Sequence, residues 1–330
     1  RTRRRHTMHE TRLLLGCAAL LAAGVLPAPV LPAQGPDGGP AWPQWRGPDR
    51  NGIATESDWS VGEQLKTLWR AEVGLGYSCV SIQDGRLYTQ GHDKEAREDT
   101  VYCLDATTGE PLWSHTFAAK SMAKAHNGGA LCTPSIDGAR VFVNSREGEF
   151  FCFDAASGKV LWSKNWPDEV DTRIPTWGFA AAPLVLPERI VLNVGRVVSF
   201  DREGEVQWTS EDYGHAYSTP ATFEHDGKEC LAVFNGNGLA VLATATGEEL
   251  AFSEWKTRYD VNAATPVVVG DKIFISSGYN RGCAMLQFDG TSLEELWASK
   301  VMRNHMSGCV EVGGYLYGFD EGTLKCLDLD

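Results

Sequence analysis

Short apolar runs alternate with polar turns from about residue 65 to the end of the chain. The runs come in pairs, and turns such as Asp84-Gly85 and Asp137-Gly138 separate the two members of a pair. Asp and Gly tolerate the positive φ that a tight hairpin needs. The second members are Leu87–Thr89, Val141–Val143, Ile190–Leu192, Leu231–Val233, Ile273–Ile275 and Tyr315–Tyr317. Each pair therefore predicts two short antiparallel strands.

A second unit follows each pair and begins with a turn. The copies that keep Asp and Trp are Asp105 with Gly109 and Trp113, Asp154 with Gly158 and Trp162, Asp201 with Trp208, and Asp289 with Trp297. Counting a weaker copy at 243 and a last one at 328, the unit returns after 39 to 49 residues. A strand-built period of this length is typical of propeller blades. Each period predicts one blade of four antiparallel strands.

The spacing within this unit has a physical reason. A carboxylate at the start of the turn accepts backbone N–H bonds, and Gly takes the left-handed position, so the next strand delivers its Trp at a fixed place. A Trp side chain buries about 150–250 Å². Because a four-stranded sheet cannot cover both of its faces, we expect these rings to wedge between neighbouring blades.

The pattern Asp-x-x-Thr-Gly-x-x-x-Trp, complete at Asp105, Thr108, Gly109 and Trp113, resembles the tryptophan-docking repeat of the PQQ-like (quinoprotein dehydrogenase-like) β-propellers. The resemblance covers residues from about 65 to the end. It implies an all-β propeller, and the BamB-like members of this group have eight blades. About six periods are present here, so we expect an open arc that is incomplete at its C-terminal end.

Three segments are expected. Residues 1–33 are interpreted as a signal peptide that starts at Met8 after upstream read-through, because Arg12 precedes an apolar run at Leu13–Leu26. A membrane anchor is the alternative, although the run is shorter than the ~20 residues of a spanning helix. Residues 34–64 form a Pro/Gly-rich arm whose segment Trp42–Gly52 resembles the opening of exported BamB-like propellers. Residues 65–330 form the propeller, and Leu68–Val73 is its candidate closing strand.

Charge and cysteine usage exclude several classes of function. The net charge of −13 provides no basic excess for nucleic acid or an anionic membrane. The repeated cysteines are Cys103, Cys152 and Cys326 before the turns, and Cys79, Cys132 and Cys309 near the first strands. Since they recur with the period, they are interpreted as small apolar residues. No Cys-x-x-Cys pair occurs, and no metal site is expected.

Candidate binding residues lie in the loops before each first strand, because equivalent loops of a propeller meet on one face around its axis. They are Tyr77, His126, Trp177, His215, Tyr217, Asn262 and His305. His215 and His305 share a register, five residues before Pro220 and Val310. The two histidines fit either a ring of ligand-binding side chains or the hydrogen-bonded lining of a wet channel, and the lining is favoured.

Two classes of function remain. The BamB resemblance implies a noncatalytic, exported scaffold that binds a protein partner in the cell envelope or periplasm, with no nucleic acid and no membrane span after signal cleavage. The wider family implies a dehydrogenase that uses PQQ with calcium. A propeller that binds a small ligand such as a sugar is a further alternative, because the sequence does not decide whether such a ligand occupies the channel. Adjacent cysteines and calcium ligands of the dehydrogenases cannot be assigned here. The scaffold is therefore preferred, with no catalytic residue and no cofactor.

Overall fold

The computed structural model describes residues 41–55, 62, 65–124 and 126–329. The chain divides into residues 1–31 and residues 32–330, and every described residue belongs to the second unit. The signal segment expected at 1–33 and the beginning of the expected arm lie outside the described residues. In the part that is described, none of the helices has the length and apolar character needed to cross a membrane.

The described residues form an all-β fold apart from one short helix, and their strands form six antiparallel sheets in chain order, which we number blades 1 to 6. Blade 1 contains β1 (Ser81–Gln83), β2 (Arg86–Asp93), β3 (Glu98–Asp105) and β4 (Pro111–Ala118). Blade 2 contains β5 (Ser135–Asp137), β6 (Arg140–Asn144), β7 (Glu149–Asp154) and β8 (Val160–Asn165), followed by α1 (Trp166–Val170). Blade 3 contains β9 (Leu184–Val185), β10 (Ile190–Val194), β11 (Arg196–Phe200) and β12 (Val206–Asp212).

The second half repeats this plan. Blade 4 contains β13 (Ala221–His225), β14 (Lys228–Asn235), β15 (Gly238–Ala243) and β16 (Glu249–Glu254). Blade 5 contains β17 (Val267–Val269), β18 (Lys272–Ser277), β19 (Gly282–Phe288) and β20 (Leu293–Ser299). Blade 6 has three described strands, β21 (Val310–Val312), β22 (Tyr315–Asp320) and β23 (Thr323–Asp328).

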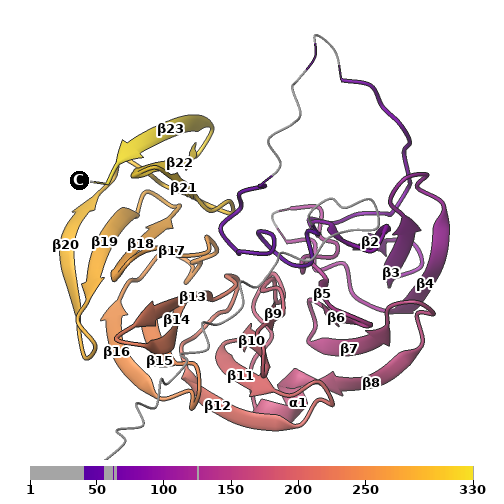
Figure 1. Ribbon diagram of the computed structural model, residues 1–330, viewed down its shortest axis with the longest axis horizontal. Coiled ribbons are helices and arrows are strands. Elements are labelled where there is room, and N and C mark those ends of the chain that lie inside the picture. Colours follow the sequence, from indigo (N-terminus) through magenta and orange to yellow (C-terminus); the bar gives the residue numbers. More distant parts are fainter. Residues whose placement is uncertain (1–40, 56–61, 63–64, 125, 330) are drawn as a thin grey trace, which may run out of the picture. The chain divides into compact units, whose positions relative to one another are not determined.

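The blades follow one another around a common centre, with blades 1 and 6 at the two ends of an arc (Figure 1). The first strand of each blade lies innermost, and β1 contacts β5, β5 contacts β9, and β13 contacts β17. This open, propeller-like arrangement is the fold class that the repeats predicted. It brings the loops before the innermost strands together at the centre.

The repeated turns have the geometry that their residues favour. Asp105 accepts hydrogen bonds from the backbone N–H groups of Thr107 and Thr108 at 2.9 and 2.8 Å through Oδ1. Gly109 takes the left-handed φ of 75° and donates to the Asp105 carbonyl at 2.8 Å. These bonds lower the pKa of the Asp105 carboxyl, since they favour its charged form.

Each of four turns also receives an indole ring from the outer segment that precedes it in the chain. The indole Nε1–H donates to the carbonyl of the second turn residue: Trp69 to Ala106 at 3.2 Å, Trp113 to Ala155 at 3.0 Å, Trp162 to Arg202 at 2.8 Å and Trp208 to Thr244 at 3.1 Å. The rings lie against the turn glycines Gly109, Gly158, Gly204 and Gly247. All four rings are half-buried, as is Trp297, which lies near Phe274. The indoles thereby connect one blade to the next.

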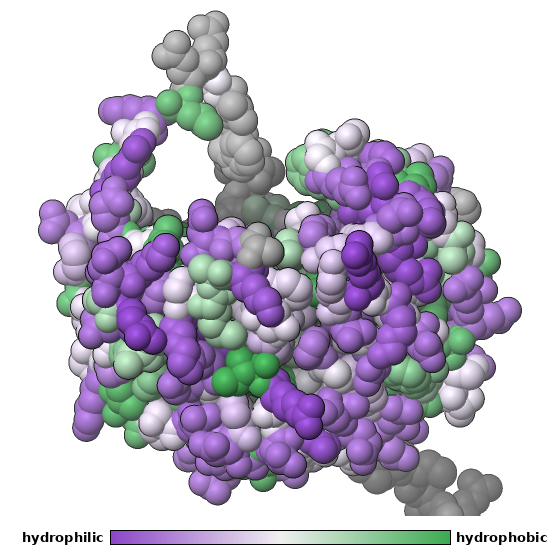
Figure 2. All heavy atoms as spheres, turned by 180° about the vertical axis from the view of Figure 1, so that it is seen from behind, coloured by the Kyte–Doolittle hydropathy of each residue, from purple (hydrophilic) through white to green (hydrophobic). Residues whose placement is uncertain are grey.

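The hydrophobic core lies between neighbouring blades. Phe142 and Phe150 of blade 2 pack with Phe200 of blade 3, and all three are fully buried. In blade 6, by contrast, alternate residues of β22 face outward, and Tyr315, Tyr317 and Phe319 are 42–49% exposed. The surface seen in Figure 2 is mainly hydrophilic, with hydrophobic residues in small separate patches.

The closing strand expected at Leu68–Val73 is not formed. Residues 65–74 belong to no strand, and Leu68 is 79% exposed. Only its last residues, Val73 and Gly74, lie against Gly91 and His92 of β2, and pairing with that strand is limited to the bridge between Leu75 and His92. Trp69 nevertheless lies against the first repeat turn, so the segment occupies the place of an outer strand ahead of blade 1.

Candidate functional site

A cavity of about 310 Å³, here called the central cavity, lies where the loops before the innermost strands meet. Its described lining residues are Trp45, Tyr77, His126, Leu131, Thr133, Trp177, Ala180, Ala182, Tyr217, Thr219, Val261, Ala263, Thr265 and Met306. Every blade contributes through the loop before its first strand. The lining contains no Asp, Glu, Lys or Arg among these residues, so the cavity is suited to a neutral group.

Four aromatic side chains from four different loops contribute to this lining. The Tyr77 and His126 rings meet edge to face at 5.9 Å, and the Trp177 and Tyr217 rings lie 6.1 Å apart. Tyr77 is 58% exposed, whereas Tyr217 is buried. Trp177 is fixed by a hydrogen bond from its indole Nε1–H to the Lys124 carbonyl. The cavity therefore has an accessible aromatic residue and a buried one.

Two polar groups at the cavity, the Tyr217 hydroxyl and the His126 ring, could orient a bound ligand. The Tyr217 hydroxyl is buried and has no hydrogen-bond partner among the described residues. Burial raises the pKa of Tyr217, which keeps the hydroxyl neutral. His126 accepts a hydrogen bond from the Gly128 N–H at Nδ1, 2.9 Å away, so the neutral ring carries its proton on Nε2. A ligand could use both groups as hydrogen-bond donors.

Trp45 comes from the segment 41–52 before the propeller, here called the arm. Its indole Nε1–H donates to Thr265 Oγ1 at 3.0 Å. Trp42 forms two backbone hydrogen bonds with Ile82 of β1, at 2.9 and 2.8 Å, and Arg46 Nη2 donates to the Cys309 carbonyl beside β21 at 2.9 Å. The arm thus runs past the innermost strands from blade 1 to blade 6, and Trp45 closes part of the cavity.

The structure brings together four of the seven expected binding residues, Tyr77, His126, Trp177 and Tyr217. His215 lies behind them, with its ring 6.2 Å from that of Tyr217. Asn262 is fully buried and donates to the carbonyls of Asn235 and Trp255 at 2.7 and 3.0 Å. It holds two chain segments together and does not line the cavity.

His305 also lies away from the cavity lining. Its ring meets that of Tyr279 at 4.5 Å and packs on Gly278. Burial lowers the pKa of His305, which favours the neutral ring. Like His215, His305 meets a tyrosine ring edge to face, and neither of the two histidines lines the cavity.

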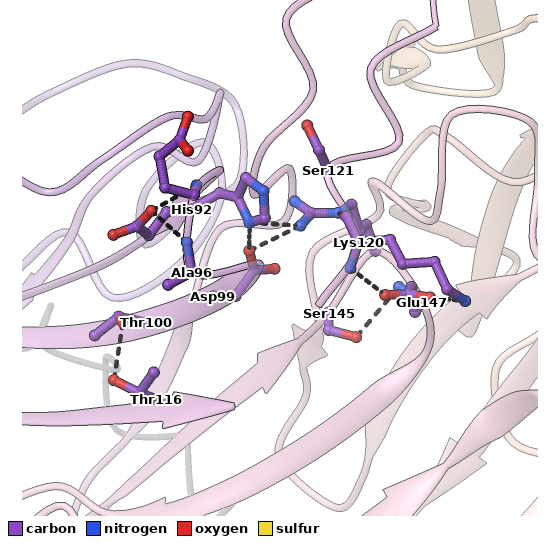
Figure 3. Close-up of polar contacts among 12 residues, drawn as sticks. His92, Ala96, Asp99, Thr100, Thr116, Lys120, Ser121, Ser145 and Glu147 are labelled. Atoms are coloured by element: carbon purple, nitrogen blue, oxygen red, sulfur yellow. Dashed lines mark hydrogen bonds and ion pairs between the residues drawn. The ribbon is translucent and has the colours of Figure 1, made fainter. Parts of the chain in front are cut away.

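A buried polar cluster lies at the junction of blades 1 and 2, and Figure 3 shows His92 and Asp99 pointing toward each other within it. His92 Nδ1 is 2.8 Å from Asp99 Oδ1, and Arg146 Nη2 donates to the same oxygen at 2.8 Å. Burial raises the pKa of Asp99 against the opposing effect of Arg146. The exposed Lys120 pairs with Glu147 beside this cluster at 2.9 Å (Figure 3).

Trp45 and Met306 line the cavity but were not among the predicted residues. Met306 follows His305 in a loop that the periodicity already singled out, so the loop was a usable signal. Trp45 had no such signal, because it precedes the repeats. Among the described residues, no group of three or more His, Cys, Asp or Glu could hold a metal ion, and the described cysteines are free.

Comparisons with known proteins agree with the propeller fold. A family profile described as outer membrane protein assembly factor BamB matches residues 62–132 and 97–330. Comparison with curated proteins gave no match. The structure is similar to BamB from Moraxella catarrhalis, with a TM-score of 0.56 and 20% identity, over 77% of this chain and 72% of that one.

Two further solved structures share the fold. Quinohemoprotein alcohol dehydrogenase from Comamonas testosteroni has a TM-score of 0.55 and 13% identity, over 79% of this chain and 49% of the enzyme. The computationally designed Ika8 protein has a TM-score of 0.50 and 13% identity, over 76% of this chain and 70% of that one. Likenesses at these identities concern the fold alone. The family profile spans most of the chain and therefore shows the family as well as the fold. The protein belongs to the BamB family of PQQ-like repeat propellers.

Proposed function

We propose that this chain is a noncatalytic, exported scaffold that holds a neutral, apolar segment of a protein partner in its central cavity. The observation that carries the proposal is the lining itself, which comes from all six blades and includes no charged carboxylate, ammonium or guanidinium among the described residues. Aromatic side chains supply large contact areas to a partner at little cost in conformational entropy. The apolar run at Leu13–Leu26 behind Arg12 supports export to the periplasm or cell envelope.

The test removes two aromatic rings at the cavity and leaves the core intact. Tyr77→Ala with Trp177→Ala is preferred over a change at Tyr217, because Tyr217 is buried and its truncation would lower stability. The double variant should keep its melting temperature within a few degrees and lose capture of the partner from envelope extract. Leu161→Ala, at an exposed position on β8, is the control. If the double variant still captures the partner, the central cavity is not the binding site.

A small neutral ligand such as a sugar would use the same aromatic rings. Binding of a sugar that is lost in the double variant, without capture of any protein, would assign the cavity to that ligand. A protein partner is favoured because the family profile names an assembly factor.

A quinoprotein dehydrogenase is the second candidate, supported only by the shared fold. Such enzymes hold PQQ with calcium, and calcium takes about six to eight oxygen ligands, many of them carboxylates. The described lining of the central cavity offers no carboxylate and the described part of the chain no metal-binding cluster, so these residues do not fit the cofactor. We expect no dye-linked alcohol oxidation when the protein is mixed with PQQ and Ca²⁺. Saturable cofactor binding with turnover would contradict this.

A further inference from the structure

The turn between β6 and β7, residues 145–148, connects two segments that reach the central cavity. The first segment, residues 119–124, follows β4, and the second, residues 177–180, precedes β9. Trp177 and Ala180 of the second segment line the cavity, whereas no residue of the turn is part of the described lining. The turn therefore lies behind the cavity and acts on it through its neighbours.

Arg146 and Glu147 hold the first segment by the backbone of Lys120. Arg146 Nε donates to the Lys120 carbonyl, and Glu147 Oε2 accepts a hydrogen bond from the Lys120 N–H at 2.7 Å (Figure 3). Burial opposes ionisation of Glu147, but the hydrogen bonds from Lys120 outweigh it and lower the pKa of the carboxyl. The carboxylate is therefore charged at neutral pH, and hydrogen bonds to charged groups are stronger than neutral ones.

The same turn holds Trp177 from the other side. The Arg146 carbonyl accepts a hydrogen bond from the Phe179 N–H at 2.9 Å. Gly178 has a φ of 85°, and a Cβ there would lie 2.6 Å from Arg146 Cβ, so this close approach requires glycine. The Trp177 indole donates to the Lys124 carbonyl of the first segment. Trp177 is thus held between two segments that are both bonded to one turn.

Arg146 is itself fixed by the buried cluster at the junction of blades 1 and 2. Its side chain is 1% exposed, and Nη2 donates to Asp99 Oδ1 at 2.8 Å and lies 3.0 Å from His92 Nδ1. The donors of a guanidinium point in fixed directions in one plane. Because Asp99 fixes this plane, Nε is directed at the Lys120 carbonyl.

We propose that Arg146 and Glu147 are positioning residues for the central cavity: through the backbone of Lys120 they set the orientation of Trp177 and hence the binding of the partner segment. The binding part of this inference rests on the proposed function, whereas the orientation of Trp177 does not. Glu147 is the residue to change, because removing the buried Arg146 would leave Asp99 without its cation and lower stability.

The orientation is tested without any partner, by the exchange of the Trp177 indole proton with water. NMR of protein with labelled tryptophan side chains measures it, and Trp177→Phe assigns the resonance. Glu147→Ala should speed this exchange by about tenfold, since the segment that carries the Lys124 carbonyl loses its hydrogen bond to the turn. Glu147→Gln retains an acceptor oxygen for the Lys120 N–H and should restore slow exchange.

The matched control for the exchange is Lys120→Ala. It removes the ion pair between Lys120 Nζ and Glu147, 2.9 Å apart, but leaves both backbone groups of residue 120 in place. Exchange at Trp177 should therefore stay at the wild-type rate. Unchanged exchange in Glu147→Ala, or equal acceleration in Lys120→Ala, overturns the proposal. Equal acceleration at the indoles of Trp113 and Trp208 overturns it as well, because it would show a general loosening of the fold.

The effect on binding is measured by capture from envelope extract. Glu147→Ala should reduce capture several-fold, Glu147→Gln should retain it, and Leu161→Ala is again the control. Undiminished capture by Glu147→Ala overturns the positioning role in binding. Failure of the wild type to capture any partner would overturn the proposed function alone, because the exchange at Trp177 does not depend on a partner.

Discussion

At the scale of residues, the indole rings of the repeats connect neighbouring blades. Trp162 shows what one ring contributes. It lies 5.6 Å from Phe150 and 6.0 Å from Phe200, and it donates a hydrogen bond to Arg202 at 2.8 Å. Trp297 lies two residues further along its strand, where it pairs with Met285, and it forms no hydrogen bond with a described residue.

Trp162→Ala should therefore lower the free energy of unfolding by about 3–5 kcal/mol, because it removes a large aromatic ring and leaves a cavity. Trp297→Ala should cost clearly less. Urea denaturation of the two variants and the wild type measures the difference. Equal losses would show that contact with the next turn contributes little.

His225 introduces a titratable contact at the junction of blades 4 and 5. Its Nδ1 lies 2.7 Å from Asp271 Oδ1, and this hydrogen bond raises the pKa of His225, with Asp226 and Asp289 adding to the effect against partial desolvation. A raised folded-state pKa stabilises the fold below the unfolded value of about 6.5, and the stabilisation is lost as the pH rises through the folded value.

The melting temperature of the wild type should accordingly exceed that of Asp271→Asn by more at about pH 6 than at about pH 9. Thermal unfolding across this range provides the comparison, with Asp226→Asn as the control because its carboxylate lies farther away, 3.7 Å from Nε2. A difference that grows with pH would contradict the assigned pair.

At the scale of elements, the arm connects the two ends of the arc. It bonds to Ile82 in blade 1 through Trp42 and to Cys309 beside blade 6 through Arg46. Arg46 also donates to the Asn51 carbonyl at 2.8 Å, which holds the arm in its turn. Since hydrogen bonds to charged groups contribute about 1.5–3 kcal/mol each, this guanidinium fastens the arm more firmly than a neutral side chain would.

Arg46→Gln should increase hydrogen exchange in β21–β23 while leaving β9–β12 nearly unchanged. Hydrogen–deuterium exchange with mass spectrometry resolves the two regions. Unchanged exchange in blade 6 would mean that the arm does not stabilise this end of the arc.

The cluster of His92, Asp99 and Arg146 joins blades 1 and 2 through buried charge. Arg146→Ala should cost about 3–5 kcal/mol of unfolding free energy, because it leaves the Asp99 carboxylate buried without its cation. Lys120→Ala removes an exposed ion pair nearby and should cost less than about 1 kcal/mol. Chemical denaturation tests both, and similar small losses would show that Asp99 is already protonated at neutral pH.

The elements could be predicted where the sequence pattern is local. The Asp-Gly hairpins and the turn from Asp105 to Gly109 depend on neighbouring residues, so they could be read directly. The His92, Asp99 and Arg146 cluster could not, because Arg146 comes from another blade and only the fold brings it there. Trp45 entered the central cavity unpredicted for the same reason, and Asn262 was misplaced there because the register of a loop does not determine where its side chain points.

On the scale of the whole molecule, the open arc has an exposed strand at one end and a cavity at its centre. Strand β22 lies at one end of the arc. Its residues Tyr315, Tyr317 and Phe319 are each 42–49% exposed. The central cavity, by contrast, is built by loops from all six blades and is closed in part by the arm. A ligand bound there would contact every blade and would stabilise their arrangement by mass action.

The central cavity is tested most directly as the partner-binding site by site-specific photo-crosslinking in envelope extract. The crosslinker is benzoyl-phenylalanine, which replaces the exposed Tyr77. The account predicts one principal partner, joined through a segment of neutral, apolar residues that mass spectrometry identifies, and loss of the crosslink in Trp177→Ala. A crosslink that persists in Trp177→Ala, or that maps to a strongly charged segment, would contradict the central cavity as the binding site.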